Sequence, residues 1–141
     1  MSRIITKSLV VSTTPAYTAG DNVGGKISFG LMNATLNSVT LLDAGNQGAA
    51  GNLFLYDGDP TAATLTDNVA HAGVADFAKL IAVIPIPSYV TTAAKKTAHV
   101  SALNLPIKST ALFGVIVTTG TPTYVAVGDL TLKLGFGPHG E

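Results

Sequence analysis

Carboxylates and imidazoles are the side chains of this sequence that could bind a metal ion or move a proton, and both are sparse. Three aspartates offer the oxygen ligands that Ca²⁺ prefers: Asp57, Asp59 and Asp67. Pro60 follows the first two directly, and no glutamate stands where an EF-hand loop needs one. The segment is equally typical of a plain turn, so we expect no metal site.

The histidines do not have the spacing of a zinc site either. His71, His99 and His139 form neither an HxH nor an HExxH pattern. Cysteine is absent, which excludes disulfides, thiol catalysis and thiolate ligands. We therefore expect surface histidines and no resident metal or cofactor.

Catalytic motifs are equally scarce. Nucleophilic catalysis needs a nucleophile, a base and an orienting group within reach of one another, and no GxSxG motif is present. The single glutamate, Glu141, excludes a paired-glutamate glycosidase, whereas an aspartate pair stays formally open. Gly24-Gly25-Lys26 resembles a phosphate loop but lacks the preceding GxxxxG frame. These observations predict a protein that is not an enzyme.

Length and charge define the general class of the protein. The 141 residues suit a single domain, 1–141, and charged residues make up 11% of them, against roughly 25% in a typical soluble domain. Zero net charge argues against a nucleic-acid-binding surface, and no apolar run approaches the roughly 18 residues that would span a bilayer. Residues 1–11 lack the apolar core of a signal peptide. Because charge depletion marks the centre of interfaces, we expect a chain that assembles with others.

Apolar residues recur mainly with period two, and Val, Ile and Thr are abundant, which predicts an all-β fold. Eight antiparallel strands separated by turn residues favour a sandwich of two four-stranded sheets, like a jelly roll. An immunoglobulin-like sandwich is the alternative, although its Cys and Trp hallmarks are missing. The strands are expected at 3–11, 22–31, 37–43, 52–57, 79–86, 97–103, 110–119 and 123–136.

Some positions have more specific expectations. Leu130, Leu132, Leu134 and Phe136 alternate with polar residues and are expected to form one core face. The apolar parity changes between Val127 and Leu130, which predicts a bend or bulge at 128–129.

Two segments are expected to leave the strand pattern. A short helix or irregular excursion is expected near 66–79, where Phe77 and Ile81 have helical spacing. Residues 91–97 are expected to form a polar loop or one helical turn.

In the first half of the chain, Val23, Ile27, Phe29 and Leu31 share a parity and are assigned to a buried face.

The apolar positions outnumber what one small sandwich core can hide. Some of Leu42, Phe54, Tyr56 and Val90 are therefore expected to face a partner. Residues 1–17 could form an extended N-terminal arm that adds a strand to a neighbouring sheet. Alternatively, the four tyrosines could line the sugar-binding surface of a carbohydrate-binding β-sandwich module: Tyr17, Tyr56, Tyr89 and Tyr124.

Several short segments between about residues 10 and 135 occur in an informative order. They are TPAYTAGDNVGG at 14–25, SVTLLD at 38–43, LFLYD at 53–57, DP at 59–60, TDN at 66–68, LFGVIV at 112–117, GTPTY at 120–124 and DLTL at 129–132. Together they resemble a family of small virion structural proteins of tailed bacteriophages and prophages.

The resemblance implies a non-enzymatic protein that is located in the virion and assembled in the host cytoplasm. It favours a capsid decoration or cement protein that binds the major capsid protein or other virion proteins and stabilises the phage head. A tail, collar or head-fibre component is the alternative within the same class. A homotrimer is favoured by analogy with the quasi-three-fold junctions of icosahedral shells. Host glycans are a further partner class that the resemblance leaves open.

Overall fold

The computed structural model describes residues 3–61 and 65–138, and strands dominate them. The strands are β1 (Arg3–Ser8), β2 (Asn22–Asp43), β3 (Gly51–Asp57), β4 (Leu80–Ile86), β5 (Val90–Thr92), β6 (Lys95–Val100), β7 (Leu105–Thr118) and β8 (Leu130–Gly137). One 3₁₀ helix, η1 (Gly73–Lys79), precedes β4. The expectation of an all-β fold with eight antiparallel strands is confirmed.

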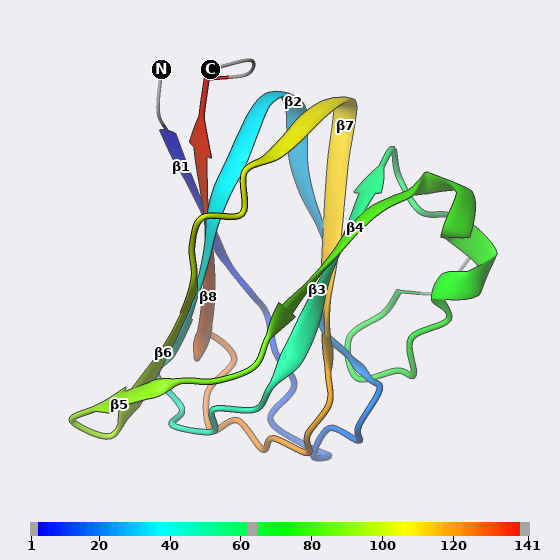
Figure 1. The fold of residues 1–141 in the computed structure, drawn as a ribbon. Helices are drawn as coiled ribbons and strands as arrows, with labels where there is room; N and C mark the ends of the chain where they lie inside the picture. Colours follow the sequence, from blue (N-terminus) through cyan, green and yellow to red (C-terminus); the bar gives the residue numbers. More distant parts are fainter. Residues whose placement is uncertain (1–2, 62–64, 139–141) are drawn as a thin grey trace.

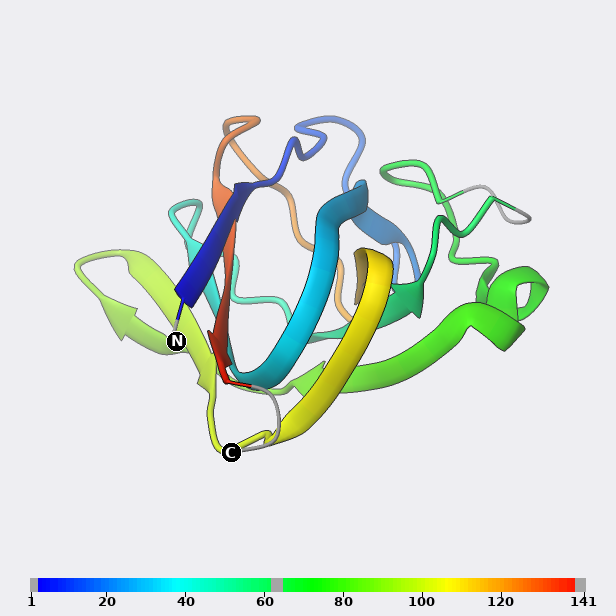
Figure 2. The same ribbon diagram turned by 90° about the horizontal axis from the view of Figure 1, so that it is seen from above.

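The strands form one hydrogen-bonded sheet that folds over onto itself. Its order is β1-β8-β2-β7-β3-β4, with β6 also paired to β2 and β5 paired to β6. Residues 22–36 of β2 pair with β7, residues 35–43 pair with β8, and residues 39–43 also pair with β6. Figures 1 and 2 show the result as two facing layers that β2 joins. We call them the β7 layer (the first part of β2 with β7, β3 and β4) and the β8 layer (β1, β8, the second part of β2, β6 and β5).

This connectivity differs from the two separate four-stranded sheets expected from the sequence. Strands expected at 22–31 and 37–43 are one strand of 22 residues, because the intervening backbone stays paired with β7 from Met32↔Ser109 to Leu36↔Leu105. The strand bends at irregularities in its register, which lie between Val23 and Ile27 and on both sides of Gly30. Gly24, Gly25 and Gly30 have φ values of 81°, 71° and 77°, a region that glycine enters without steric cost.

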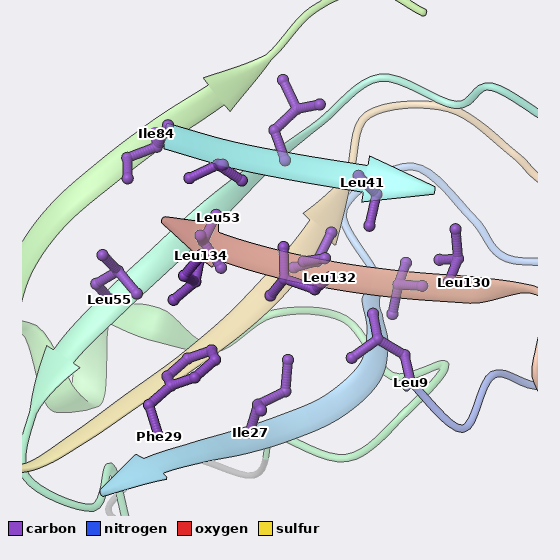
Figure 3. Packing of buried hydrophobic residues seen from close by; sticks show 14 of the residues in the cluster. Leu9, Ile27, Phe29, Leu41, Leu53, Leu55, Ile84, Leu130, Leu132 and Leu134 are labelled. Atoms are coloured by element: carbon purple, nitrogen blue, oxygen red, sulfur yellow. The ribbon is translucent and has the colours of Figure 1, made fainter. Parts of the chain in front are cut away.

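The core lies between the two layers. Leu130, Leu132, Leu134 and Phe136 are all buried on one face of β8, as the alternation predicted. Figure 3 shows Leu134 beside Leu53 of β3 and Leu130 towards Leu9 at the other end of β8, with Ile27 and Phe29 of β2 in the same cluster. Burial of each such side chain contributes roughly 1.5–3 kcal/mol, so this inner core is the main source of stability.

The loop before β8 corrects the expected start of the last strand. Residues 123–129 are outside the strand, and Val125 and Val127 are exposed. Asp129 Oδ2 accepts hydrogen bonds from the backbone N–H groups of Val125 and Ala126, both at 3.0 Å, and so holds a turn. The chain therefore does bend next to Gly128, but the bend lies before the first residue of β8 and does not interrupt the strand.

The hairpin β5–β6 corrects the expectation of a polar loop or helical turn at 91–97. Val90, Thr91 and Thr92 pair with Thr97, Lys96 and Lys95. Ala93 and Ala94 form the tip with φ values of 49° and 64°, as a two-residue type I′ turn requires at both positions. Alanine is uncommon at these two positions, so the residue types do not indicate a turn.

The N-terminal segment is part of the domain instead of a free arm. β1 pairs with β8 from Arg3↔Phe136 to Ser8↔Thr131. Leu9, Val11 and Tyr17 are then buried in the inner core. The expected extended arm at 1–17 is corrected for the described residues, because the segment pairs with β8 and packs into the inner core, although Ile4 and Val10 stay exposed.

An excursion between β3 and β4 covers the outer surface of the β7 layer, and it confirms the irregular segment expected near 66–79. Leu65 packs there on Tyr56, Val115 and Val117, which form a second, smaller hydrophobic cluster. We call it the outer cluster. The segment is a 3₁₀ helix and not an α-helix, and Phe77 is 70% exposed, so the helical spacing did not mark a core face.

Candidate functional site

The four residues expected at an interface lie on two different surfaces. Leu42 on β2 pairs with Thr97 on β6, and Thr97 pairs with Val90 on β5, so Leu42 and Val90 share a row across three strands. Leu42 is half-buried and Val90 is exposed. Phe54 and Tyr56 lie on the outer face of the β7 layer, and Tyr56 is fully buried in the outer cluster. The prediction for Tyr56 is therefore corrected: its side chain does not reach the surface.

The outward side of the β8 layer is rich in hydroxyl groups. Its outward side chains alternate with buried ones along each strand, and we call this surface the threonine face. It consists of Ile4, Thr6, Ser8, Ser38, Thr40, Leu42, Val90, Thr92, Lys95, Thr97, His99, Thr131 and Lys133. Among the described residues, its only charges are the two lysines.

The sequence reading missed the threonine face as a unit. Threonines alternate with leucines or lysines at 6, 40, 97 and 131, which is an alternation that marks an outward face within each strand. Their gathering on one surface depends on the register of four strands, namely Thr6↔Lys133↔Thr40↔His99 and Ser8↔Thr131↔Leu42↔Thr97. A register of this kind cannot be read from a single strand.

His71 lies in a polar network beside the outer cluster. Its Nδ1 is 2.8 Å from Asn22 Oδ1, and its Nε2 is 3.3 Å from the hydroxyl of Tyr56. Its ring packs on Phe54 with the ring centroids 4.5 Å apart. Asn22 has only an acceptor oxygen to offer at Nδ1, so Nδ1–H donates and Nε2 accepts the Tyr56 hydroxyl proton. Burial lowers the pKa of His71 and therefore favours this neutral form.

The same network affects Tyr56. Burial, and then the negative charge of Asp76, raise the pKa of the Tyr56 hydroxyl. The proton thus stays on Tyr56, which keeps the donor that His71 needs. The arrangement holds the excursion to β2 and β3 and contains no activated nucleophile.

The three aspartates considered as calcium ligands are engaged separately. Asp57 accepts a hydrogen bond from Ser109 Oγ at 2.6 Å, and Asp59 forms an ion pair with Lys26. Asp67 accepts hydrogen bonds from Ser12 Oγ, from the Tyr17 hydroxyl at 2.6 Å and from the Gly24 amide at 2.7 Å. Within residues 3–61 and 65–138, no group of three metal-ligating side chains gathers at one place. Asp67 thus ties the excursion to the N-terminal segment and to β2.

The remaining expected site residues are placed as follows. His99 is exposed on the threonine face, with Nδ1 2.7 Å from Thr40 Oγ1, whereas His139 and Glu141 lie outside the described residues. Gly24-Gly25-Lys26 is a strand irregularity and not a phosphate loop.

The four tyrosines do not form an exposed aromatic surface. Tyr17 and Tyr124 are buried and meet edge to face with ring centroids 5.8 Å apart. Tyr89 is half-buried and its hydroxyl donates to the carbonyl of Ala49 at 3.0 Å. With Tyr56 buried as well, these rings offer no platform on which a sugar could stack.

Comparison with models of known protein families gives no match, and comparison with curated proteins gives none either. None of the described helical segments is long and apolar enough to cross a membrane.

Proposed function

We propose that this protein is a non-enzymatic structural component of a bacteriophage or prophage virion, and that it decorates the capsid shell as a cement protein. The threonine face is the observation that carries the proposal. It is five strands wide, it is poor in charge, and it holds the partly exposed Leu42 and the exposed Val90. Charge-poor surfaces with central apolar residues are typical of the buried part of interfaces.

The internal chemistry supports the same proposal. The described carboxylates discussed above are bound to side-chain or backbone donors, and His71 is neutral and hydrogen-bonded on both ring nitrogens. A protein that decorates a shell needs a rigid body and a contact surface instead of an activated group. Many copies on one shell then stabilise it through avidity, even when each contact is weak.

Binding to emptied particles of the phage that encodes the chain tests the proposal. Thr97→Asp adds a charge between Leu42 and Val90 on the threonine face and should reduce co-sedimentation with the particles about tenfold or more. Ser28→Asp is the matched control, because Ser28 is exposed on β2 in the other layer. Equal binding by both variants would remove the threonine face from the contact. No binding by the unmodified protein would contradict the decoration role.

The copy number in purified particles separates the two locations within the virion. A number comparable with that of the major capsid protein, measured by quantitative mass spectrometry, is expected for a shell protein. A few copies per particle would identify a tail, collar or head-fibre component.

A further inference from the structure

Leu31 is a large apolar side chain that the structure turns outward. It is 72% exposed, although it follows Ile27 and Phe29 in the alternation that the sequence analysis assigned to the core. The register of β2 shifts on both sides of Gly30, so the buried position after Phe29 is taken by Met32 instead. A bulge that re-aims a side chain in this way is a feature that often accompanies function.

Two hollows flank Leu31 on opposite sides of β2. The hollow towards β7 and β3 measures about 480 Å³ and is lined by Asp57, Lys108 and Ser109, among others. The hollow towards β1 and β8 measures about 310 Å³ and is lined by Arg3 and Phe136, among others. Leu31 lines both of them, so it stands as a knob between two depressions.

The hollow towards β1 and β8 carries Arg3, whereas the hollow towards β7 and β3 carries both Asp57 and Lys108. Arg3 contacts the sulfur of Met32 at 3.4 Å, and Asp57 accepts the hydrogen bond from Ser109. The ion pair between Lys26 and Asp59 lies elsewhere, and neither Arg3 nor Asp57 forms an ion pair with another described residue. An arginine and a carboxylate are therefore available on the two sides of the same knob.

We propose that a second copy of this chain docks here, with Leu31 of one copy inserted into the hollow beside Asp57 of the other. This inference rests on the homo-oligomer expected in the sequence analysis, and it names the surface that would hold the oligomer. The insertion brings Arg3, on the far side of the inserted Leu31, towards Asp57 of the receiving copy. The knob, the hollow and both charges are thus supplied by one sequence.

The arrangement fits a second copy because each surface carries both halves of the contact. Leu31 of one copy is removed from water when it enters the hollow of the other copy, which Leu31 of that copy also lines. The opposite charges of Arg3 and Asp57 then fix the orientation of the two copies. Lys108 lines the same hollow as Asp57 and opposes Arg3. The contact is consequently weaker than it would be without that lysine.

Sedimentation equilibrium over a range of concentrations tests the contact. Leu31→Ser should raise the dissociation constant of the oligomer about tenfold or more, because it removes the central apolar anchor. Val125→Ser is the matched control, since Val125 is 82% exposed in the loop before β8, and it should leave the constant unchanged. An equal mass distribution for Leu31→Ser and the unmodified protein would overturn the inference.

Charge variants test the orientation independently. Arg3→Glu should dissociate the oligomer, and the double variant Arg3→Glu with Asp57→Lys should restore it. Lys108→Ala should tighten the association and increase its sensitivity to added salt, because the attraction between Arg3 and Asp57 is then no longer offset. If the double variant associates as weakly as Arg3→Glu, although its thermal unfolding matches that of the unmodified protein, then Arg3 and Asp57 are not in contact across the interface.

The particle-binding assay keeps this inference distinct from the proposed function. A Leu31→Ser monomer that still binds particles would leave the decoration role intact and confirm a separate self-contact. If the unmodified protein is a monomer at every concentration, the self-contact is wrong, and the decoration role is then judged by particle binding alone. A knob that inserts into another virion protein would show as monomeric protein whose binding to particles is lost in Leu31→Ser.

Discussion

The inner core and the outer cluster lie on opposite faces of the same β7 layer, but different interactions hold them. The inner core consists mainly of alternating apolar residues from the strands of both layers, which the pairing of the strands positions. The outer cluster is formed when a single irregular segment brings Leu65 onto Tyr56, Val115 and Val117. That segment is fixed by Asp67, Asn22 and His71, so polar contacts position the cover of the outer cluster.

The difference shows that two kinds of burial coexist in this small domain. Strand alternation specifies the first kind, because each strand contributes a continuous apolar row. The second kind depends on hydrogen bonds whose partners are separated by 43 to 55 residues in the sequence. We therefore expect the inner core to respond most to lost volume, and the outer cluster to respond most to lost polar partners.

The largest effect is expected in the inner core. Leu132 is fully buried, and Leu132→Ala should lower the free energy of unfolding by about 3–5 kcal/mol, because it removes apolar contacts and leaves a cavity. Urea denaturation measures the loss. Thr131→Ala, on the outward side of the same strand, is the control and should cost less than about 1 kcal/mol. Equal losses would mean that the faces of β8 are assigned wrongly.

Removal of the Asp67 carboxylate should destabilise the cover of the outer cluster, although Asp67 is partly exposed. Asp67→Ala removes three hydrogen bonds to a carboxylate and should cost about 2–3 kcal/mol. Asp59→Ala breaks only the exposed ion pair with Lys26 and should cost less than about 1 kcal/mol. Hydrogen exchange should locate the damage of the first variant in the excursion and the N-terminal segment. Uniform loss of protection would show that the two regions are not separable.

His71 should make the cover of the outer cluster sensitive to acid, with a smaller effect. Burial lowers the pKa of His71 in the folded state, so the folded protein binds a proton less readily than the unfolded chain does. The stability that neutral His71 contributes is complete above the unfolded-state pKa of about 6.5, and it is lost as the pH falls below that value through the folded-state pKa. Stability profiles of the unmodified protein and of His71→Gln should diverge in shape below that pH. His99→Gln is the control. If the pH profile of its stability differs from that of the unmodified protein as much as the profile of His71→Gln does, His71 is not the source of the acid sensitivity.

The sequence predicted the inner core well because alternation is a local signal. The residues of β8 on one parity are all buried, as expected, and the strand class of the fold followed from the same pattern. The prediction failed at Leu31, where one glycine with positive φ shifts the parity of the following residues. A glycine within a strand announces such a shift as a possibility but does not give its direction.

The candidate surfaces were less predictable than the core. Leu42 and Val90 were expected at an interface and do share a row, but nothing in their separate strands indicated that β5 would pair with β6. Tyr56 lies on the outer face of β3, and its side chain is buried because the excursion packs over it. Pairing register and the path of irregular segments are tertiary properties, which the strand period does not encode.

The smallest effect is expected for the hairpin β5–β6, which contributes only Ala98 and the partly buried Val100 to the inner core and no residue to the outer cluster. Ala93 and Ala94 adopt left-handed backbone conformations that disfavour residues with a β-carbon. Ala93→Asn combined with Ala94→Gly supplies the residues that a type I′ turn prefers, and it should stabilise the hairpin by about 1 kcal/mol. Hydrogen exchange should show stronger protection of the amides of β5 and β6, with unchanged protection in the excursion and in β8. Reduced protection in the hairpin would contradict the turn geometry, and a gain spread over both clusters would show that the hairpin is coupled to them.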